Sequence, residues 1–134
     1  MIGITETWLT ENKAAMYNIS GYNHESKYKV NRAGGGVSLF IKEGLEYQLR
    51  QDLIIFNQIF ESIFVEISKT QLEFETDIIV GVIYRPPNTD ISVFNENLLL
   101  ILSKVKKEKK LYIYWVISIL TCLMLTNMIL LQNF

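Results

Sequence analysis

The sequence predicts a mixed α/β fold, and three segments support this prediction. Residues 77–84 (DIIVGVIY) form a continuous apolar run that ends at two prolines, as expected of a strand buried on both faces. Residues 61–67 (ESIFVEI) alternate apolar and polar side chains, with Phe64 as the exception, which is the period-2 pattern of a half-buried strand. Residues 88–107 begin with Asn-Thr-Asp and repeat apolar side chains at helical spacing, which predicts an amphipathic helix.

The remaining elements are shorter. Residues 2–5 are β-branched and apolar, so we expect a strand, and residues 10–17 resemble a short helical turn capped by Thr10. Residues 22–30 are charged and alternate loosely, which indicates a loop or an edge strand. The run RAGGG at 32–36 predicts a tight turn into a strand at 37–41, a weaker strand is expected at 45–50, and the next strand after the helix is expected at 111–114. This order of strands, helix and strand is a mixed α/β layout.

Composition restricts the class of protein. The 134 residues favour one domain, and 13 basic against 14 acidic residues exclude a strongly basic nucleic-acid binder, although a nuclease with a local basic patch stays open. A single cysteine, Cys122, permits no internal disulfide and no zinc spacing, and we expect it to be a buried small apolar residue. The lone histidine, His24, is expected to be an ordinary surface residue in an early loop.

Three short motifs could carry chemistry. Glu6 follows the first strand, the glycine run at 34–36 precedes the next, and Tyr84-Arg85 ends the buried strand. Groups at the carboxyl ends of strands often line an active crevice, where a carboxylate suits Mg²⁺ and a Tyr-Arg pair suits a phosphate. Each motif also has a structural explanation: a solvated or capping glutamate, a packed tyrosine with a satisfied hydroxyl, and a hairpin or bulge.

Taken in order, these motifs resemble a known family. An "ETWL" strand end, an "R-GGGV" hairpin, an "ES-V-I" strand and a "Y-PP" strand end follow one another in the endonuclease/exonuclease/phosphatase (DNase I-like) domain of non-LTR retrotransposon reverse transcriptases. The resemblance covers residues 2–114. It implies a four-layer α/β sandwich of two packed mixed β-sheets with flanking helices, and Mg²⁺-dependent hydrolysis of DNA phosphodiester bonds by a cytoplasmic or nuclear protein. It also implies that Glu6 is the metal ligand and that Tyr84 contacts the scissile phosphate, while no role carries over to Arg85 or Asn88.

Other parts of the family pattern are missing. The strand with its asparagine is not found before residue 2, the Asp-X-Asn pair is not found after Tyr114, and the Asp-His pair is absent. No aspartate occurs after Asp90. Hydrolysis by this route needs a metal, an activated water and charge stabilisation held in one geometry. We therefore expect little or no nuclease activity, and no small-molecule cofactor is indicated.

The last part of the chain is an uncharged apolar tail, which can be explained in two ways. Residues 111–131 are long enough to span a bilayer as a helix, and the basic run at 104–110 precedes them, so a small tail-anchored membrane protein with no enzymatic role is one alternative. A buried core helix is harder to place in so small a domain. A non-catalytic binding module, in which Glu6, Tyr84 and Arg85 are structural, is a further alternative.

The second explanation of the tail comes from the genetic code. If the codons are read one base early, from the last base of the Tyr114 codon, Trp115 and Val116 force Leu-Gly. The following triplets permit Asp-Phe-Asn-Ile-Asp-Leu, which is the missing metal-binding strand at the expected position. Met128-Ile129 forces one more aspartate. We favour this frameshift over a membrane anchor, and we divide the chain into a partial endonuclease domain (1–114) and an out-of-frame, helix-like apolar tail (115–134).

Overall fold

The structure is a computed structural model, and it describes residues 1–30, 34–71, 74–120 and 123–131. Side chains are described as far as Tyr114, and the last two strands are described beyond it by their backbone. Cys122 lies outside the described residues, and so do residues 32–33 of the predicted turn.

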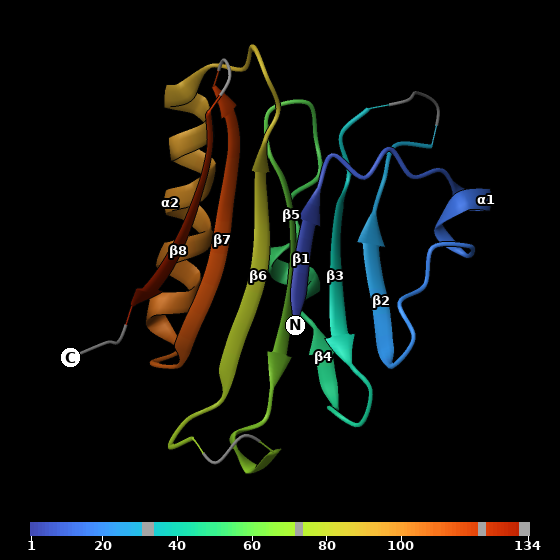
Figure 1. The fold of residues 1–134 in the computed structure, drawn as a ribbon. Helices are drawn as coiled ribbons and strands as arrows, with labels where there is room; N and C mark the ends of the chain where they lie inside the picture. The colour runs from blue at the N-terminus through green and yellow to red at the C-terminus, as the bar shows by residue number, and fades with distance from the viewer. Residues whose placement is uncertain (31–33, 72–73, 121–122, 132–134) are drawn as a thin grey trace.

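Two β-sheets form the centre of the molecule (Figure 1). The smaller sheet is antiparallel, with the order β1-β3-β2: β1 (Ile2–Thr5), β3 (Val37–Lys42) and β2 (Tyr22–Lys27). The larger sheet has the order β4-β5-β6-β7-β8: β4 (Tyr47–Leu49), β5 (Glu61–Ile67), β6 (Ile78–Arg85), β7 (Leu111–Leu120) and β8 (Leu123–Leu131). In the larger sheet only β6 and β7 are parallel. The mixed α/β class is therefore confirmed, and the small sheet differs from the expected mixed sheet.

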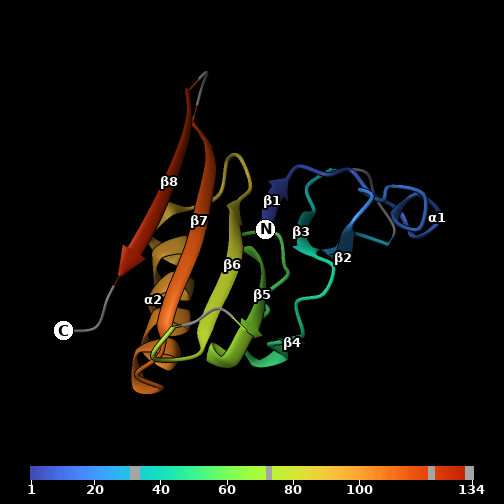
Figure 2. The same ribbon diagram turned by 60° about the horizontal axis from the view of Figure 1, so that its bottom comes forward.

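The helices of the described chain are few. They are α1 (Glu11–Ala14), α2 (Ile91–Lys107) and the short 3-10 turns η1 (Gln51–Leu53) and η2 (Lys69–Gln71). Figures 1 and 2 show α2 against the larger sheet and α1 beside β2, at the opposite end of the molecule. Thr10 precedes α1 as predicted, but its side chain makes no capping hydrogen bond. The described elements thus provide one full helical layer, on the larger sheet.

The core has two parts, one on each face of the larger sheet. Between the sheets, apolar side chains of β3 pack on those of β5 and β6: Val37, Leu39, Ile41, Ile63, Val65, Ile78, Val80, Val82 and Tyr84. On the other face, α2 covers Phe64, Ile79 and Ile83. β5 is therefore buried on both faces except at Glu66, and the predicted half-buried strand is wrong there. The alternation predicts that one face of β5 is exposed to solvent, but α2 covers that face.

Helix α2 forms where its spacing predicts. Phe94, Ile101 and Val105 recur on one face and are buried against the sheet. The Asp90 side chain caps the helix by accepting hydrogen bonds from the backbone N–H groups of Ser92 (2.7 Å) and Val93 (3.3 Å). After the helix, the strand β7 returns parallel to β6, so β6, α2 and β7 form a β-α-β unit.

The expected C-terminal helix is wrong, whereas the strand expected at 111–114 is confirmed as the start of β7. Residues 111–120 and 123–131 form the antiparallel strands β7 and β8, and β7 pairs with β6 from Ile78↔Leu111 to Arg85↔Ser118. Hydropathy cannot distinguish a buried strand from a helix, whereas the β-branched and aromatic residues of this segment favour a strand. Without β7, the backbone of β6 would present an unpaired edge. None of the helices that the structure describes is both long and apolar enough to cross a membrane.

His24 also differs from its expectation. It lies in β2 and not in a loop, its Nε2 is 2.9 Å from Ser38 Oγ, and its ring stacks on Phe40 with 4.2 Å between centroids. Burial lowers the pKa of His24, and the nearby Glu25 carboxylate opposes this effect in part. His24 is therefore a packed side chain of the smaller sheet.

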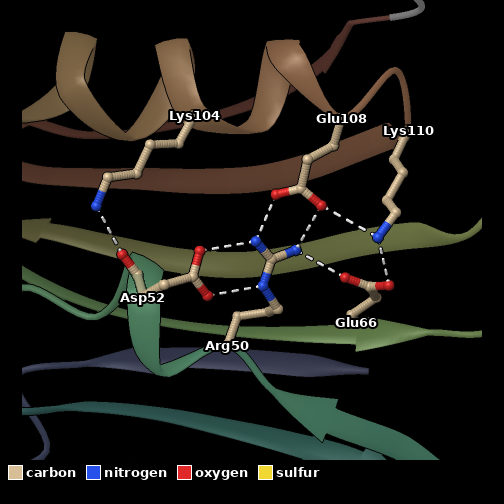
Figure 3. A network of polar contacts seen from close by, with 6 residues as sticks. All are labelled: Arg50, Asp52, Glu66, Lys104, Glu108 and Lys110. Atoms are coloured by element: carbon tan, nitrogen blue, oxygen red, sulfur yellow. Dashed lines mark hydrogen bonds and ion pairs between the residues drawn. The ribbon is translucent and has the colours of Figure 1, made fainter.

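A network of charged side chains joins the end of α2 to the larger sheet (Figure 3). Arg50 lies at its centre and donates hydrogen bonds to Asp52 (2.8 Å), Glu66 (2.7 Å) and Glu108 (2.5 Å). Lys110 bridges Glu66 (2.6 Å) and Glu108 (3.1 Å). The network therefore ties η1, β5, the C-terminal end of α2 and the start of β7 together.

Candidate functional site

The structure brings the three sequence motifs together at one end of the sheets. β1 ends where β3 begins, because Thr5 pairs with Val37, so the segments around Glu6 and Gly36 lie next to each other. Tyr84 lies near the end of β6 and points between the two sheets. A pocket of about 660 Å³ opens here, and its lining comes from all three motifs and neighbouring loops: Glu6, Trp8, Lys29, Gly34, Gly35, Gln58, Ile59, Tyr84 and residues 86–90.

The Glu6 carboxylate accepts hydrogen bonds from all three motifs of the site. Its Oε1 accepts a hydrogen bond from the Tyr84 hydroxyl. Its Oε2 accepts hydrogen bonds from Trp8 Nε1 (2.7 Å) and from the backbone N–H of Gly35 (3.1 Å). Glu6 is therefore neither a freely solvated glutamate nor a helix cap, which were the structural explanations for it. Tyr84 is fully buried with its hydroxyl satisfied, as its structural explanation described.

The backbone around Glu6 is in an unusual conformation. Both Glu6 (φ 54°) and Trp8 (φ 51°) lie in the left-handed region, which costs a residue other than glycine on the order of 1–3 kcal/mol. Two hydrogen bonds hold the segment in place, from Thr7 N to the Gly36 carbonyl (3.4 Å) and from Trp8 N to the Gly35 carbonyl (3.0 Å). Strain of this kind is often found at binding and catalytic sites.

Sequence reasoning missed a second carboxylate at this site. Glu61, the first residue of β5, is fully buried and is the register partner of Tyr84. Its Oε2 accepts a hydrogen bond from the backbone N–H of Gly36 (2.7 Å), and its Oε1 pairs with Lys29 Nζ at 2.8 Å. A buried carboxylate needs such partners, because desolvation of a lone charge is costly. The available signal was a glutamate opening an otherwise apolar strand, which by itself is weak.

Gly35 and Gly36 donate hydrogen bonds to these two carboxylates and have no room for a side chain. A Cβ atom on Gly35 would lie 2.6 Å from Glu61 Oε1, and one on Gly36 would lie 2.4 Å from Thr7 Oγ1. Both glycines also have positive φ, 71° and 96°, which side chains rarely adopt. Since their N–H groups already bond to Glu6 and Glu61, these two donors do not form a phosphate cradle.

The described residues show no complete set of protein ligands for a magnesium ion. Mg²⁺ takes near-octahedral oxygen ligands and usually binds one or two carboxylates together with waters and substrate phosphates. Within residues that the structure describes, no three His, Cys, Asp or Glu side chains gather as metal ligands. Glu6 already accepts three hydrogen bonds, and the other acidic side chain of the pocket lining, Asp90, caps α2.

Arg85 and Asn88 occupy different surroundings. Arg85 is 8 % exposed, follows Tyr84 on β6 and therefore points to the opposite face of the sheet, and its Nε has no hydrogen-bond partner in the described chain. Asn88 has a left-handed backbone (φ 60°) and lines the pocket. Asn88 is thus near Glu6 and Tyr84, whereas Arg85 is not part of the pocket lining.

Comparison of the chain with protein-family models, with curated proteins and with solved structures found no match.

Proposed function

We propose that this chain derives from a DNase I-like, Mg²⁺-dependent DNA endonuclease domain of the retrotransposon type and has lost phosphodiester hydrolysis. The motifs that carry the resemblance are far apart in sequence, yet Glu6, Gly35 and Tyr84 surround one pocket. Unrelated motifs would have no reason to converge, so this convergence supports the proposal. The DNA partner and the metal come from the resemblance.

The observation that carries the proposal is the register of β7. If the codons are read one base early from the last base of the Tyr114 codon, they force Leu-Gly and permit Asp-Phe-Asn after it, which would place an aspartate at position 117 and an asparagine at position 119. In the folded chain, position 117 is the register partner of Tyr84 on the neighbouring parallel strand. Partners in register project to the same face of a sheet, and so does position 119, two residues further on. The aspartate would therefore adjoin Tyr84 and Glu6.

The same register explains the expected loss of activity. In the present frame the two positions hold Ile117 and Ile119, and no acidic residue occurs after Glu108. The pocket then keeps Glu6 and Tyr84 but has no second carboxylate from β7. Glu6 already accepts three hydrogen bonds and Asp90 caps α2, so these two carboxylates do not assemble the metal and the activated water that this route of hydrolysis needs.

The nucleotide sequence of the gene tests the frameshift directly. We expect the codon of Val116 to end in G, that of Ile117 to end in T, and that of Ser118 to be TCA. With these bases, the frame that is read one base early (the early frame) encodes Asp-Phe-Asn at positions 117–119. We also expect the early frame to stay open beyond this strand and to encode an Asp-His segment. Any other base at one of these three positions would exclude the Asp-Phe-Asn strand and with it the frameshift.

A plasmid-nicking assay with Mg²⁺ tests the loss of activity. We expect no nicking above background from the purified chain, and the same result from Glu6→Ala as the matched control. Nicking that requires Mg²⁺ and disappears in Glu6→Ala would show that the residues present are sufficient, and it would contradict the proposed loss of hydrolysis. Circular dichroism of both proteins establishes that they are folded during the assay.

A further inference from the structure

Trp8 combines two features that are seldom found together. The residue is 58 % exposed, although a large aromatic ring usually buries most of its surface. At the same time the ring is held in place, because its Nε1 donates a 2.7 Å hydrogen bond to Glu6 Oε2. The backbone below it keeps a left-handed φ of 51° through the hydrogen bond to the Gly35 carbonyl. The structure thus presents a rigid aromatic face to solvent at the rim of the pocket.

The pocket beside Trp8 is suited to a flat, polar-edged ligand. Its volume of about 660 Å³ lies in the range of ligand sites. Gln58 and Asn88 bring amide groups that both donate and accept hydrogen bonds, and Pro86 and Pro87 bring apolar surface. A nucleobase has this combination of a flat aromatic face and an edge with donors and acceptors.

The charges of the pocket favour the base over its phosphate. Two carboxylates, Glu6 and Asp90, line the pocket and would repel a phosphate. Among the lining residues that the structure describes, the one lysine is Lys29, and it already pairs with the buried Glu61 at 2.8 Å. The base amino groups can instead donate to carboxylate oxygens.

We propose that Trp8 is a stacking platform on which the pocket binds an unpaired nucleobase of a single-stranded nucleic acid. Stacking on an aromatic side chain is available to every base, so this binding tolerates many sequences. It needs neither a metal nor bond cleavage. The choice of nucleic acid among flat ligands rests on the proposed function.

The test measures binding to the whole chain in EDTA. Trp115→Phe leaves Trp8 as the only tryptophan, so its emission reports on its own ring. We expect a short single strand of deoxyadenosine to quench this emission saturably. A strand of the same length without bases is expected to bind poorly and to leave the emission unchanged. Equal binding of the abasic strand would overturn the inference, because the contact would then be to the backbone.

Variants separate stacking from a structural role of Trp8. By fluorescence anisotropy of a labelled deoxyadenosine strand, Trp8→Ala should weaken binding by roughly 5-fold or more, since stacking on an aromatic ring contributes on the order of 1–3 kcal/mol per base. Trp8→Phe keeps a ring but loses the Nε1 donor to Glu6, and it should keep most of the affinity. The matched control Phe74→Ala removes another exposed aromatic ring outside the pocket and should change nothing.

The outcomes are unambiguous once circular dichroism shows the variants to be folded. Equal losses in Trp8→Phe and Trp8→Ala would mean that Trp8 only positions Glu6, and unchanged binding in Trp8→Ala would mean that it does not contact the base. Either result overturns the inference and leaves the proposed function intact. An unsuitable codon at Val116, Ile117 or Ser118 would overturn the frameshift without affecting the binding result.

Discussion

Replacing Gly81 by alanine is expected to lower the free energy of unfolding by about 3 kcal/mol, at the upper end of the usual cost of overpacking a core. A Cβ atom at this position would lie 2.0 Å from a ring carbon of Phe64. The two residues are register partners on β6 and β5, and Phe64 is only 2 % exposed beneath α2. The ring therefore has no free space into which it could move. Urea unfolding followed by circular dichroism measures the change as a fall in the midpoint.

Two further variants identify the clash as the cause. Gly44→Ala places a Cβ in open space at a φ of 87°, so it should cost only about 1–2 kcal/mol, from the backbone conformation alone. In a Phe64→Ala background the ring is gone, and Gly81→Ala should then cost much less than in the parent chain. Additive losses in the double variant would contradict the proposed contact between the ring and Gly81.

Arg50→Met is expected to lower the free energy of unfolding by about 2 kcal/mol at neutral pH, which is below the 3–5 kcal/mol of a fully buried pair because the network is partly solvated. The Arg50 side chain is 11 % exposed, and its guanidinium group bonds to three carboxylates, Asp52, Glu66 and Glu108 (Figure 3). Methionine has a similar volume but no charge. The three carboxylates would then lie close together without the Arg50 cation between them. Arg50→Lys should recover only part of the loss, because an ammonium group cannot make both bidentate contacts.

The effect of Arg50 should depend on pH. Its hydrogen bonds hold the pKa values of Asp52 and Glu108 below their usual range. The folded pKa values are thus lower than the unfolded values of about 4, so this stability is complete above that pH and is lost as the pH falls through the folded values. Urea unfolding measures the free energy of unfolding of wild type and Arg50→Met at pH 6 and at pH 3. We expect the two free energies to differ by a large amount at pH 6 and by a smaller amount at pH 3. An unchanged difference would contradict this account.

Local sequence patterns were sufficient to predict the elements whose burial follows a regular pattern along the chain. The segments β1, β3, β6 and α2 were all predicted from the sequence, because period-2 alternation, a continuous apolar run and helical spacing each describe a single element. Asp90 was likewise recognisable as the start of α2, since its cap is a contact between neighbours in sequence. These predictions depend on interactions within a few residues.

The candidate site could be predicted only in part. Glu6 and Tyr84 were selected because both occupy strand ends, but their hydrogen bond joins residues 78 positions apart, and only the packing of the sheets creates it. The Glu61–Lys29 pair gave no usable pattern, since each residue by itself looks like an ordinary surface charge. The register of position 117 against Tyr84 was also invisible in the sequence, because it depends on the length of α2 and the loops around it.

The sequence by itself determined the alternation of strands and helix, the glycine positions and the absence of charge from the tail. Tertiary structure decided that the strand expected at 111–114 continues to Leu120 and is followed by β8, because an apolar segment is stable as helix or strand and the open edge of β6 offers hydrogen bonds to a strand. It also decided that β5 is buried on both faces, where α2 covers the side that alternation had assigned to solvent. Periodicity describes one chain segment, whereas burial depends on what packs against it.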